Sequence, residues 1–476
     1  MCEGKNKMVC GNESIERNFF GRVGRPLGGR GLEIAAHAVA LGLIYLTSTA
    51  AHALPSFAQQ TGKPCSQCHS VSFGPALTAY GRQFKLNGYV WGDAKQVIPP
   101  VALMVQGGFT QTSKDQVDQP APHFATNDNL SVDQVSLFYG GRFTEHVGAL
   151  IQMTYSGESR TTHWDNTDIR FANTASFGNT SLVYGVTINN NPTVQDLWNS
   201  TPAWAYPYIT SALAPFPAAK PVLAGGLAQL VMGATAYTMI DDHLYLEAGG
   251  YRGVSNHWLK NLGIGSDANP NMDGLSPYWR ASWQMDFGQQ YFSVGAYGLN
   301  SKFQPDPSVP LQDRFNDVAL DATYQYTTDT GHGVAVDFNV IHEKQTLDAS
   351  FASGGSASNS NHLNAVSMDV TYAYLQTYVA SGGLFSTSGS TDMGLYSPGP
   401  VSGSLTGSPD SRGYIIQLEY VPFGKLESFA KPYLNVRLGL QYTGYTRFNG
   451  GNSNYDGFGR SASDNNTLFG FFWFAL

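Results

Sequence analysis

The chain has 476 residues and a formal net charge of −8, and only 13% of its residues are charged. This acidic balance argues against nucleic acid and anionic membrane surfaces as partners. Few charges combined with abundant Gly, Ser, Asn, Thr and Tyr favour many strands with open loops over a helical core.

The first predicted element is a leader spanning residues 1–53. Arg22, Arg25 and Arg30 precede an apolar run from Ile34 to Leu46, and small residues follow it up to Ala53. A basic stretch, a short apolar run and an Ala-x-Ala ending make up a cleaved secretory signal peptide. The apolar run is too short for a transmembrane helix. We therefore expect an exported protein.

The four cysteines divide between the leader and the mature chain. Cys2 and Cys10 lie in the leader, so the mature chain keeps Cys65 and Cys68. The pentapeptide Cys65-Ser-Gln-Cys68-His69 is the attachment signature of a c-type haem. In such a motif the two thiols form thioether bonds to the haem and the imidazole ligates its iron.

Two other chemistries use the same residue types. Half of a zinc site would need a second Cys/His pair, and no other cysteine remains to supply it. A thioredoxin-like dithiol should open a helix within a βαβ unit, and the surrounding pattern predicts no such unit. The sequence therefore predicts one covalently attached haem c, with a bare redox pair as the main alternative.

The haem motif belongs to a segment spanning residues 54–98, in which we expect a short helix from Pro75 to Leu86. This segment is too small to support a core of its own, so it must pack against a larger body. Arg82 and Lys85 lie on the predicted helix as candidates for pairing with the haem propionates. Contact with acidic lumen residues or with solvent is the equal alternative.

The second axial ligand of the iron must come from outside this segment. Residues 54–98 contain no methionine and no histidine other than His69. Met104 is the nearest candidate, at the start of the first predicted strand. It has an alternative role as an ordinary residue facing lipid or the plug, in which case water or another group takes the sixth position.

Residues 99–476 alternate between apolar and polar positions, with the period of two that is typical of strands. Clear series begin at Val147, Val318, Val334 and Leu434 and continue on every second residue. A transmembrane barrel with a wet interior and a soluble β-sandwich share this period, and loop length distinguishes them. The long connections are expected near 112–130, 157–166, 191–225, 252–277, 301–314, 345–363, 387–411 and 446–466.

Seven short connections separate these eight long ones, the last of them at Phe423-Gly424. The count predicts about sixteen antiparallel strands with both termini on the periplasmic side. An aromatic terminal strand, Leu468 to Leu476, agrees with this prediction. The predicted fold is all-β: an outer-membrane barrel with a small N-terminal haem-bearing helical plug in its lumen.

Two long loops carry further candidates. The third, from Asn191 to Leu223, resembles a constriction loop that folds into the lumen and could cover the haem or present an aromatic interface. The first holds residues suited to a divalent cation, although such loops are usually only solvated. The cation candidates are Asp115, Asp118, His123 and Asp128.

The residues around the motif resemble those of the fused cytochrome c–porins of outer membranes, known from iron-oxidising bacteria. The matching residues are Ala58 to Gly62, Cys65 to His69, Phe73, Pro75, Leu77, Thr78 and Gly81 to Tyr89. The resemblance implies that Cys65 and Cys68 carry the haem and that His69 is its proximal ligand. Gln59 and the Phe73-Gly74-Pro75 spacing depart from the family pattern, which leaves the electron donor open.

These features predict electron transfer across the outer membrane of a Gram-negative bacterium through a single haem. The resemblance implies extracellular Fe(II) as donor and a periplasmic cytochrome or copper protein as acceptor, which would make the chain an Fe(II):cytochrome c-type oxidoreductase. One alternative is a solute porin with a structural or gating haem plug. Another is the same conduit with a donor other than iron. Outer-membrane lipid is the expected surrounding.

Overall fold

The computed structural model describes residues 55–476 except 72, 93–99, 266–270, 307, 426, 427, 429 and 431–433. The predicted leader, with Cys2 and Cys10, lies outside the described residues. So do the two predicted boundaries, after residue 53 and after residue 98. Within the described part of the chain, no helix is both long enough and apolar enough to cross a membrane.

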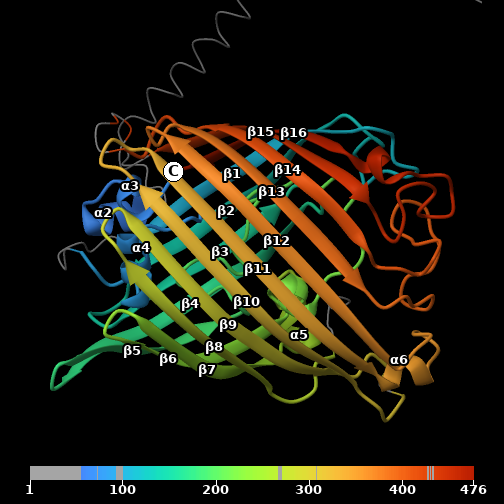
Figure 1. The fold of residues 1–476 in the computed structure, drawn as a ribbon, viewed down its shortest axis with the longest axis horizontal. Coiled ribbons are helices and arrows are strands. Elements are labelled where there is room, and N and C mark those ends of the chain that lie inside the picture. Colours follow the sequence, from blue (N-terminus) through green and yellow to red (C-terminus); the bar gives the residue numbers. More distant parts are fainter. Residues whose placement is uncertain are drawn as a thin grey trace, which may run out of the picture. The chain divides into compact units, whose positions relative to one another are not determined.

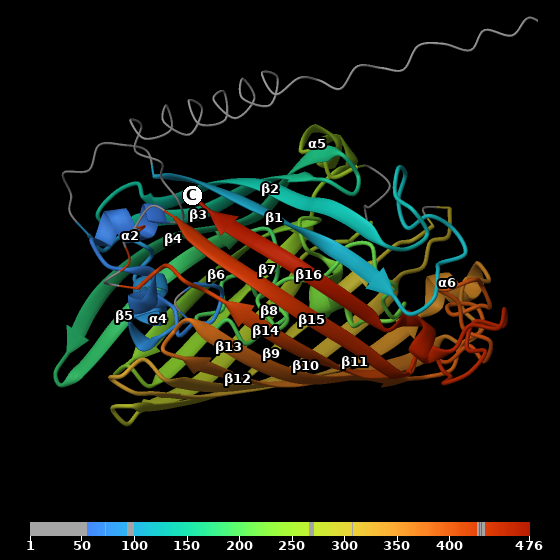
Figure 2. The same ribbon diagram turned by 90° about the horizontal axis from the view of Figure 1, so that it is seen from above.

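Sixteen antiparallel strands form one closed barrel in which each strand pairs with its neighbours in sequence (Figures 1 and 2). The ring closes between the first and last strands, where Met104 lies opposite Ala475. The prediction of about sixteen antiparallel strands is confirmed. The strands are β1 (Val101–Thr112), β2 (Asn129–Arg142), β3 (Val147–Ser156), β4 (Thr161–Phe177), β5 (Thr180–Asn189), β6 (Val231–Ile240), β7 (Leu244–Gly253), β8 (Ser276–Asp286), β9 (Gln290–Phe303), β10 (Asp313–Thr327), β11 (Gly333–Leu347), β12 (Ser360–Tyr374), β13 (Tyr378–Gly389), β14 (Ser411–Tyr420), β15 (Asn435–Arg447) and β16 (Thr467–Ala475).

The predicted alternation corresponds to the two faces of the barrel wall. On β10 the exposed residues include Val318 and Leu320, whereas the intervening Asp317 and Asp321 are buried on the lumen side. The series beginning at Val147, Val334 and Leu434 follow this pattern in part: Met153, Phe338 and Leu440 are exposed, whereas Ala149 and Val436 are buried. Successive side chains of a strand point to opposite faces, so one period produces an apolar exterior and a polar lumen.

Two predicted connections have the wrong length. The connection between β3 and β4 covers only residues 157–160, because β4 begins at Thr161, opposite Ser156. The connection between β14 and β15, predicted as a short turn at Phe423-Gly424, extends from 421 to 434. It is longer because it also contacts the N-terminal segment, where the Ser66 amide donates to the Gly424 carbonyl at 3.0 Å.

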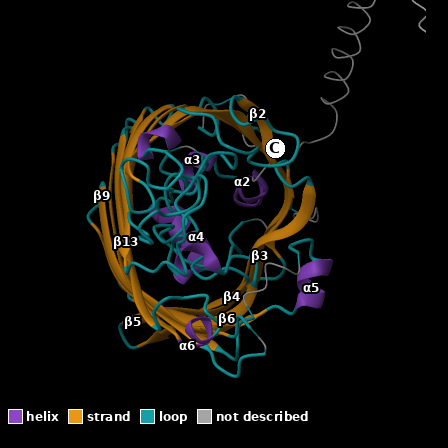
Figure 3. Cartoon of the chain, turned by 90° about the vertical axis from the view of Figure 1, so that its right-hand side faces the viewer, coloured by secondary structure: helices purple, strands orange, loops and turns teal. Residues whose placement is uncertain are grey.

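The N-terminal segment lies inside the barrel at the end that carries the short turns (Figure 3). Its helices are α2 (Pro55–Thr61), α3 (Cys65–Cys68) and α4 (Ala79–Leu86), and shorter helices α5 (Asn256–Asn261) and α6 (Asp348–Ala352) belong to loops. The helix predicted from Pro75 begins four residues later, because Leu77 pairs with His69 in a β-bridge and Thr78 caps the helix. We call residues 55–92 the plug.

The plug has a small aromatic core that is completed by the barrel. Phe57, Phe84 and Tyr89 pack with ring centroids 5.1–5.8 Å apart. The side-chain amide of Gln60 donates from Nε2 to the Tyr89 and Trp91 carbonyls. Its Oε1 atom accepts a hydrogen bond from the backbone amide of Arg142 on β2. A segment too small to fold alone is thus joined to the wall by buried hydrogen bonds.

The connection from 190 to 230, called the inner loop, folds into the lumen, as predicted. Val194, Leu197 and Trp198 are buried, and the side-chain amide of Gln441 on β15 donates to the Ile209 carbonyl. Of its aromatic residues, only Phe216 is largely exposed, with 73% of its surface accessible. The inner loop therefore packs against the plug and the wall and does not form an external aromatic surface.

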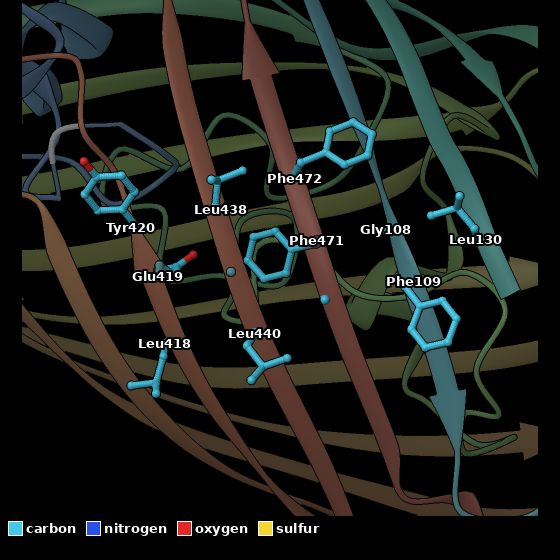
Figure 4. A pocket seen from close by; sticks show the side chains of 12 residues that line it. Gly108, Phe109, Leu130, Leu418, Glu419, Tyr420, Leu438, Leu440, Phe471 and Phe472 are labelled. Carbon is cyan, nitrogen blue, oxygen red and sulfur yellow. The ribbon is translucent and has the colours of Figure 1, made fainter. Parts of the chain in front are cut away.

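The outer surface is apolar, with tyrosines near the short-turn end. These tyrosines are at least one-third exposed, and they are Tyr324, Tyr326, Tyr372, Tyr374, Tyr378 and Tyr420. An apolar groove crosses β1, β15 and β16, where Gly470 adds no side chain and Leu438, Leu440 and Phe472 line the surface (Figure 4). An apolar band with an aromatic rim is the usual exterior of a membrane barrel.

Aromatic side chains of the lumen lie over glycines on neighbouring strands, which provides a test of the inward packing. A Cβ atom added at Gly233 would lie under 3.0 Å from three atoms of the buried Tyr251 ring. We predict that Gly233→Val lowers the free energy of unfolding by about 1–3 kcal/mol, because the ring must move. The neighbouring outward substitution Ala234→Val is the control and should have little effect. Urea titration of both variants in detergent measures the difference, and equal losses would contradict this packing.

Candidate functional site

The Cys65–His69 motif forms a single helical turn. Cys65 and Cys68 begin and end α3, and the His69 amide donates to the Cys65 carbonyl at 2.9 Å. Residues three apart lie on the same side of a helix, so the two thiols share one face of the turn. The motif therefore presents two thiols and the following imidazole from one compact element.

The turn is held between the barrel and α4. The Thr78 amide donates to the Cys68 carbonyl at 2.9 Å, and its hydroxyl donates to the Gln67 carbonyl at 2.6 Å. At Gly81, a Cβ atom would collide with the Cys68 carbonyl oxygen, so only glycine allows α4 to approach so closely. The Gly424 carbonyl fixes the other side through Ser66.

The two thiols are not built for dithiol redox chemistry. Cys65 is buried and its sulfur accepts a hydrogen bond from the Asn435 side chain at 3.1 Å. Burial raises the pKa of Cys65, and it raises the pKa of Cys68 to about 12. Reactive dithiols rely on a lowered thiol pKa, so this environment argues against the bare redox pair.

The imidazole of His69 is in the state that a metal requires. Burial lowers the pKa of His69 to about 4, which leaves the ring neutral at physiological pH. Neutral imidazole is the form that binds metals. Its Nδ1 atom is buried and forms no hydrogen bond within the described structure.

The barrel wall beside the motif carries further buried polar atoms without hydrogen-bond partners. They are Asn435 Oδ1, Arg437 Nη1 and Trp473 Nε1, and the nearby Ser70 Oγ belongs to the plug. Arg437 lies opposite Trp473 in the β15–β16 ladder and beside Gly74 of the plug. Leaving a buried polar group unpaired costs about 1–3 kcal/mol, so these atoms are able to take up a polar group. Other buried lumen atoms share this property, among them Arg280 Nη1 and Asp321 Oδ1.

Arg82 and Lys85 bind neutral groups of the protein. Arg82 Nη1 donates to the Leu77 carbonyl and to Gln325 Oε1, each at 2.8 Å, and its guanidinium lies over the Tyr291 ring. Lys85 Nζ donates to the Val194 carbonyl and to Asn199 Oδ1, each at 2.9 Å. Both side chains are buried between the wall and the inner loop, and neither forms an ion pair among the described residues. Acidic lumen residues are nevertheless near, because Asp168, Asp196 and Glu247 act on the charge of Lys85 and Asp337 acts on that of Arg82. Propionate pairing and contact with acidic lumen residues both stay predictions.

Met104 faces the lumen and lies in the same hydrophobic cluster as Phe73, Ala76 and Trp473. Its sulfur accepts a long hydrogen bond from the Gln106 side chain at 3.5 Å. Met104 thus packs against the plug, and its role as the sixth ligand of the iron stays a prediction. Its neighbours in the plug are residues that follow His69 in the sequence.

The acidic residues of the first long loop are not assembled into a site. Asp115 accepts from Asn127 at 3.0 Å, and Asp128 accepts from Gln111 at 2.9 Å. Among the described residues, no group of three His, Cys, Asp or Glu side chains is arranged to hold a metal ion. Asp115 and Asp128 instead accept hydrogen bonds from amide side chains of the loop and of β1.

Two site residues are defined mainly by the structure. Arg437 alternates with the apolar series that begins at Leu434, and Trp473 belongs to the aromatic terminal strand, but neither residue is predicted as part of the site. Period-two alternation places both in the lumen, but their position beside the motif depends on the ladder that joins β15 to β16.

No protein-family model and no curated protein matches the chain. Solved structures with a similar fold include an anion-selective porin from Comamonas acidovorans (11% identity, TM-score 0.41, 79% of this chain and 98% of that chain). They also include OmpF of Salmonella typhi in complex with daunomycin (12%, 0.45, 79% and 97%) and OprB of Pseudomonas putida (11%, 0.44, 79% and 92%). At these identities and TM-scores, the similarity supports no inference about what this chain binds.

The ion pair beside the motif gives one prediction. Arg437 Nε lies 2.6 Å from Glu419 Oε1, and both side chains are buried. Arg437→Met should lower the free energy of unfolding by about 3–5 kcal/mol, because it leaves a buried carboxylate without a partner. Adding Glu419→Gln should recover much of that loss. A double-mutant cycle from urea titrations measures the coupling, and purely additive losses would contradict the pairing.

Lys85 gives a prediction about pH. Burial lowers the pKa of Lys85 from 10.5 to about 7, so the folded protein holds this proton less tightly than the unfolded chain. The resulting penalty on folding is complete below pH 7 and disappears as the pH rises from 7 to 10.5. The free energy of unfolding of the wild type, relative to Lys85→Met, should therefore increase across that window. Unfolding titrations at several pH values measure it, and parallel profiles would contradict burial of the charge.

Proposed function

We propose that this chain spans the outer membrane and transfers electrons through one haem c, attached to Cys65 and Cys68 and ligated by His69. The observation that carries the proposal is the placement of the motif. A turn with two thiols and a neutral imidazole is fixed inside a closed barrel, beside buried polar atoms that lack partners. When bound, the haem would supply one-electron redox chemistry.

The residues present fit such a group. The shared face of α3 suits two thioether bonds, and the neutral ring of His69 suits iron ligation. Among the described cations beside the motif, Arg437 keeps Nη1 unpartnered, whereas Arg82 and Lys85 are engaged. Arg437 is therefore a stronger candidate for a propionate than the two plug residues. Met104 stays the candidate for the sixth position because its thioether faces the lumen next to the plug.

Placement in the outer membrane rests on the barrel itself. A closed barrel leaves no strand edge unpaired, and its exterior is apolar with tyrosines near one end. With the short turns on the periplasmic side, the plug faces the periplasm and the long loops face outward. A periplasmic cytochrome or copper protein is then the natural electron acceptor.

The donor is the least constrained partner. On β9 to β12, every carboxylate lies on the lumen face, but these groups are engaged within the protein: Asp317 accepts from the Leu223 amide, and Asp321 pairs with Arg280. The proposed donor, extracellular Fe(II), therefore rests on the family resemblance, with another reductant as the alternative. Each Fe(II) would lose one electron outside the cell, and each carrier molecule would gain one in the periplasm.

A second function is favoured by the barrel alone. Sixteen strands enclose a lumen wide enough for solutes, and a loop that folds inward can narrow it. The chain would then be a solute porin whose plug has a structural or gating role. Its acidic lumen would favour cations over anions.

One experiment separates the two functions. The detergent-solubilised protein, mixed with Fe(II), should show reduction of the haem absorbance within seconds. Cys65→Ser/Cys68→Ser should lose covalently bound haem, and His69→Ala should alter the haem spectrum and slow the reduction. A matched Ser66→Ala variant changes the same turn without a ligand and should behave as the wild type.

Solute flux is measured in parallel on liposomes that contain the protein. Absence of covalent haem, or absence of reduction together with cation-selective flux, would favour the porin. Reduction at the normal rate in His69→Ala would contradict the proposed role of this residue.

A further inference from the structure

Charges are completely separated across the wall formed by β9, β10, β11 and β12. All lysine and arginine residues of these four strands are exposed on the outer face, namely Lys302, Arg314 and Lys344. All carboxylates of the same strands lie on the lumen side, namely Asp313, Asp317, Asp321, Asp337, Glu343 and Asp369. The outer face is therefore positive without any acidic residue of its own.

Two of these cations lie opposite each other, and the third lies opposite a histidine. Lys302 lies directly across from Arg314 in the β9–β10 ladder, and Lys344 lies across from His362 in the β11–β12 ladder. His342 is on the same face, with its ring centroid 6.3 Å from that of His362. Like charges directly opposite each other destabilise a sheet. We call these five residues the basic patch.

The cations of the basic patch are not in ion pairs. Among the residues that the structure describes, none of its lysine or arginine side chains forms a salt bridge. The exposed Asp273 lies beside Lys302, where its backbone amide donates to the Lys302 carbonyl at 2.8 Å. The nearest described carboxylates of the same strands, including Asp313 and Glu343, are buried on the opposite face. The repulsion is thus left for an external anion to relieve.

The surface next to the basic patch is apolar. Along β10, the outward residues after Arg314 are Asn316, Val318 and Leu320, and the last two are each 51% exposed. On β11 and β12, His342 is followed towards the short-turn end by Val340, and Val366 lies opposite Val340. A positive row above an apolar wall matches an amphiphile with an anionic head and acyl chains.

We propose that the basic patch binds the phosphate groups of a phosphorylated glycolipid in the outer leaflet of the membrane. Lys302, Arg314 and Lys344 donate to the phosphate oxygens, and the acyl chains cover the apolar rows beneath. The long-loop end of these strands is where that leaflet meets water in the proposed orientation. The inference rests on the membrane placement of the barrel and is independent of the haem.

The test compares variants of the full mature protein in non-ionic detergent. The probe is diphosphorylated lipid A, and native mass spectrometry measures its apparent dissociation constant. Arg314→Gln/Lys344→Gln should weaken binding by roughly tenfold to thirtyfold, because it removes two cations from an anionic lipid surface. The charge-preserving pair Arg314→Lys/Lys344→Arg should bind like the wild type.

Arg252→Gln is the matched control, since Arg252 is an exposed cation on β7 whose cross-strand neighbour is Met232. Circular dichroism and unchanged gel mobility before heating confirm that each variant is folded. Equal weakening by Arg252→Gln would overturn the proposal. Equal affinity of the wild type for fully dephosphorylated lipid A, or for inorganic phosphate alone, would also overturn it. Haem content does not enter the measurement, so failure here and failure of electron transfer are separate results.

Discussion

Closure of the sheet between β1 and β16 is the constraint from which the other features follow. It leaves each strand with two partners, so the backbone hydrogen bonds of the wall are satisfied within the wall itself. Each side chain must then face either the lumen or the outside. On β10 this places Asp317 and Asp321 inside and Val318 and Leu320 outside. A polar lumen and an apolar exterior are two consequences of one hydrogen-bond pattern.

The polar lumen determines which segments of the chain can pack inside it. The plug and the inner loop bring backbone groups that must find partners, and buried charges of the wall supply them. Arg170 pairs with Asp168 at 2.8 Å and also donates to the Lys85 and Gln195 carbonyls, so one side chain joins wall, plug and inner loop. Arg280 pairs with Asp321 of the wall and Asp196 of the inner loop. These ion pairs and hydrogen bonds hold together segments that are far apart in sequence.

Buried polar atoms that remain without hydrogen-bond partners are also informative. His69 Nδ1, Arg437 Nη1 and Trp473 Nε1 lie close to the Cys65–His69 turn and form no hydrogen bond among the described residues. On the outside, the cations of the basic patch form no salt bridge within the described part of the chain. Both places are able to take up an external polar group. The haem in the lumen and the phosphate at the outer surface are our proposals for these groups.

Local pattern was sufficient for the features that depend on neighbouring residues. The motif at residues 65–69, the alternation of β10 and β11 and the number of strands are all properties of short stretches of chain. The start of α4 at Ala79, the long β14–β15 connection and the partners of Arg82 and Lys85 are not. They depend on contacts such as Arg82 with Gln325 and Ser66 with Gly424, which join residues more than 200 positions apart. The sequence by itself determined the two faces of the wall and the number of strands, whereas haem attachment at residues 65–69 stays a prediction. Only the tertiary structure decided which wall residues stand beside the motif, because barrel closure and lumen packing choose those neighbours.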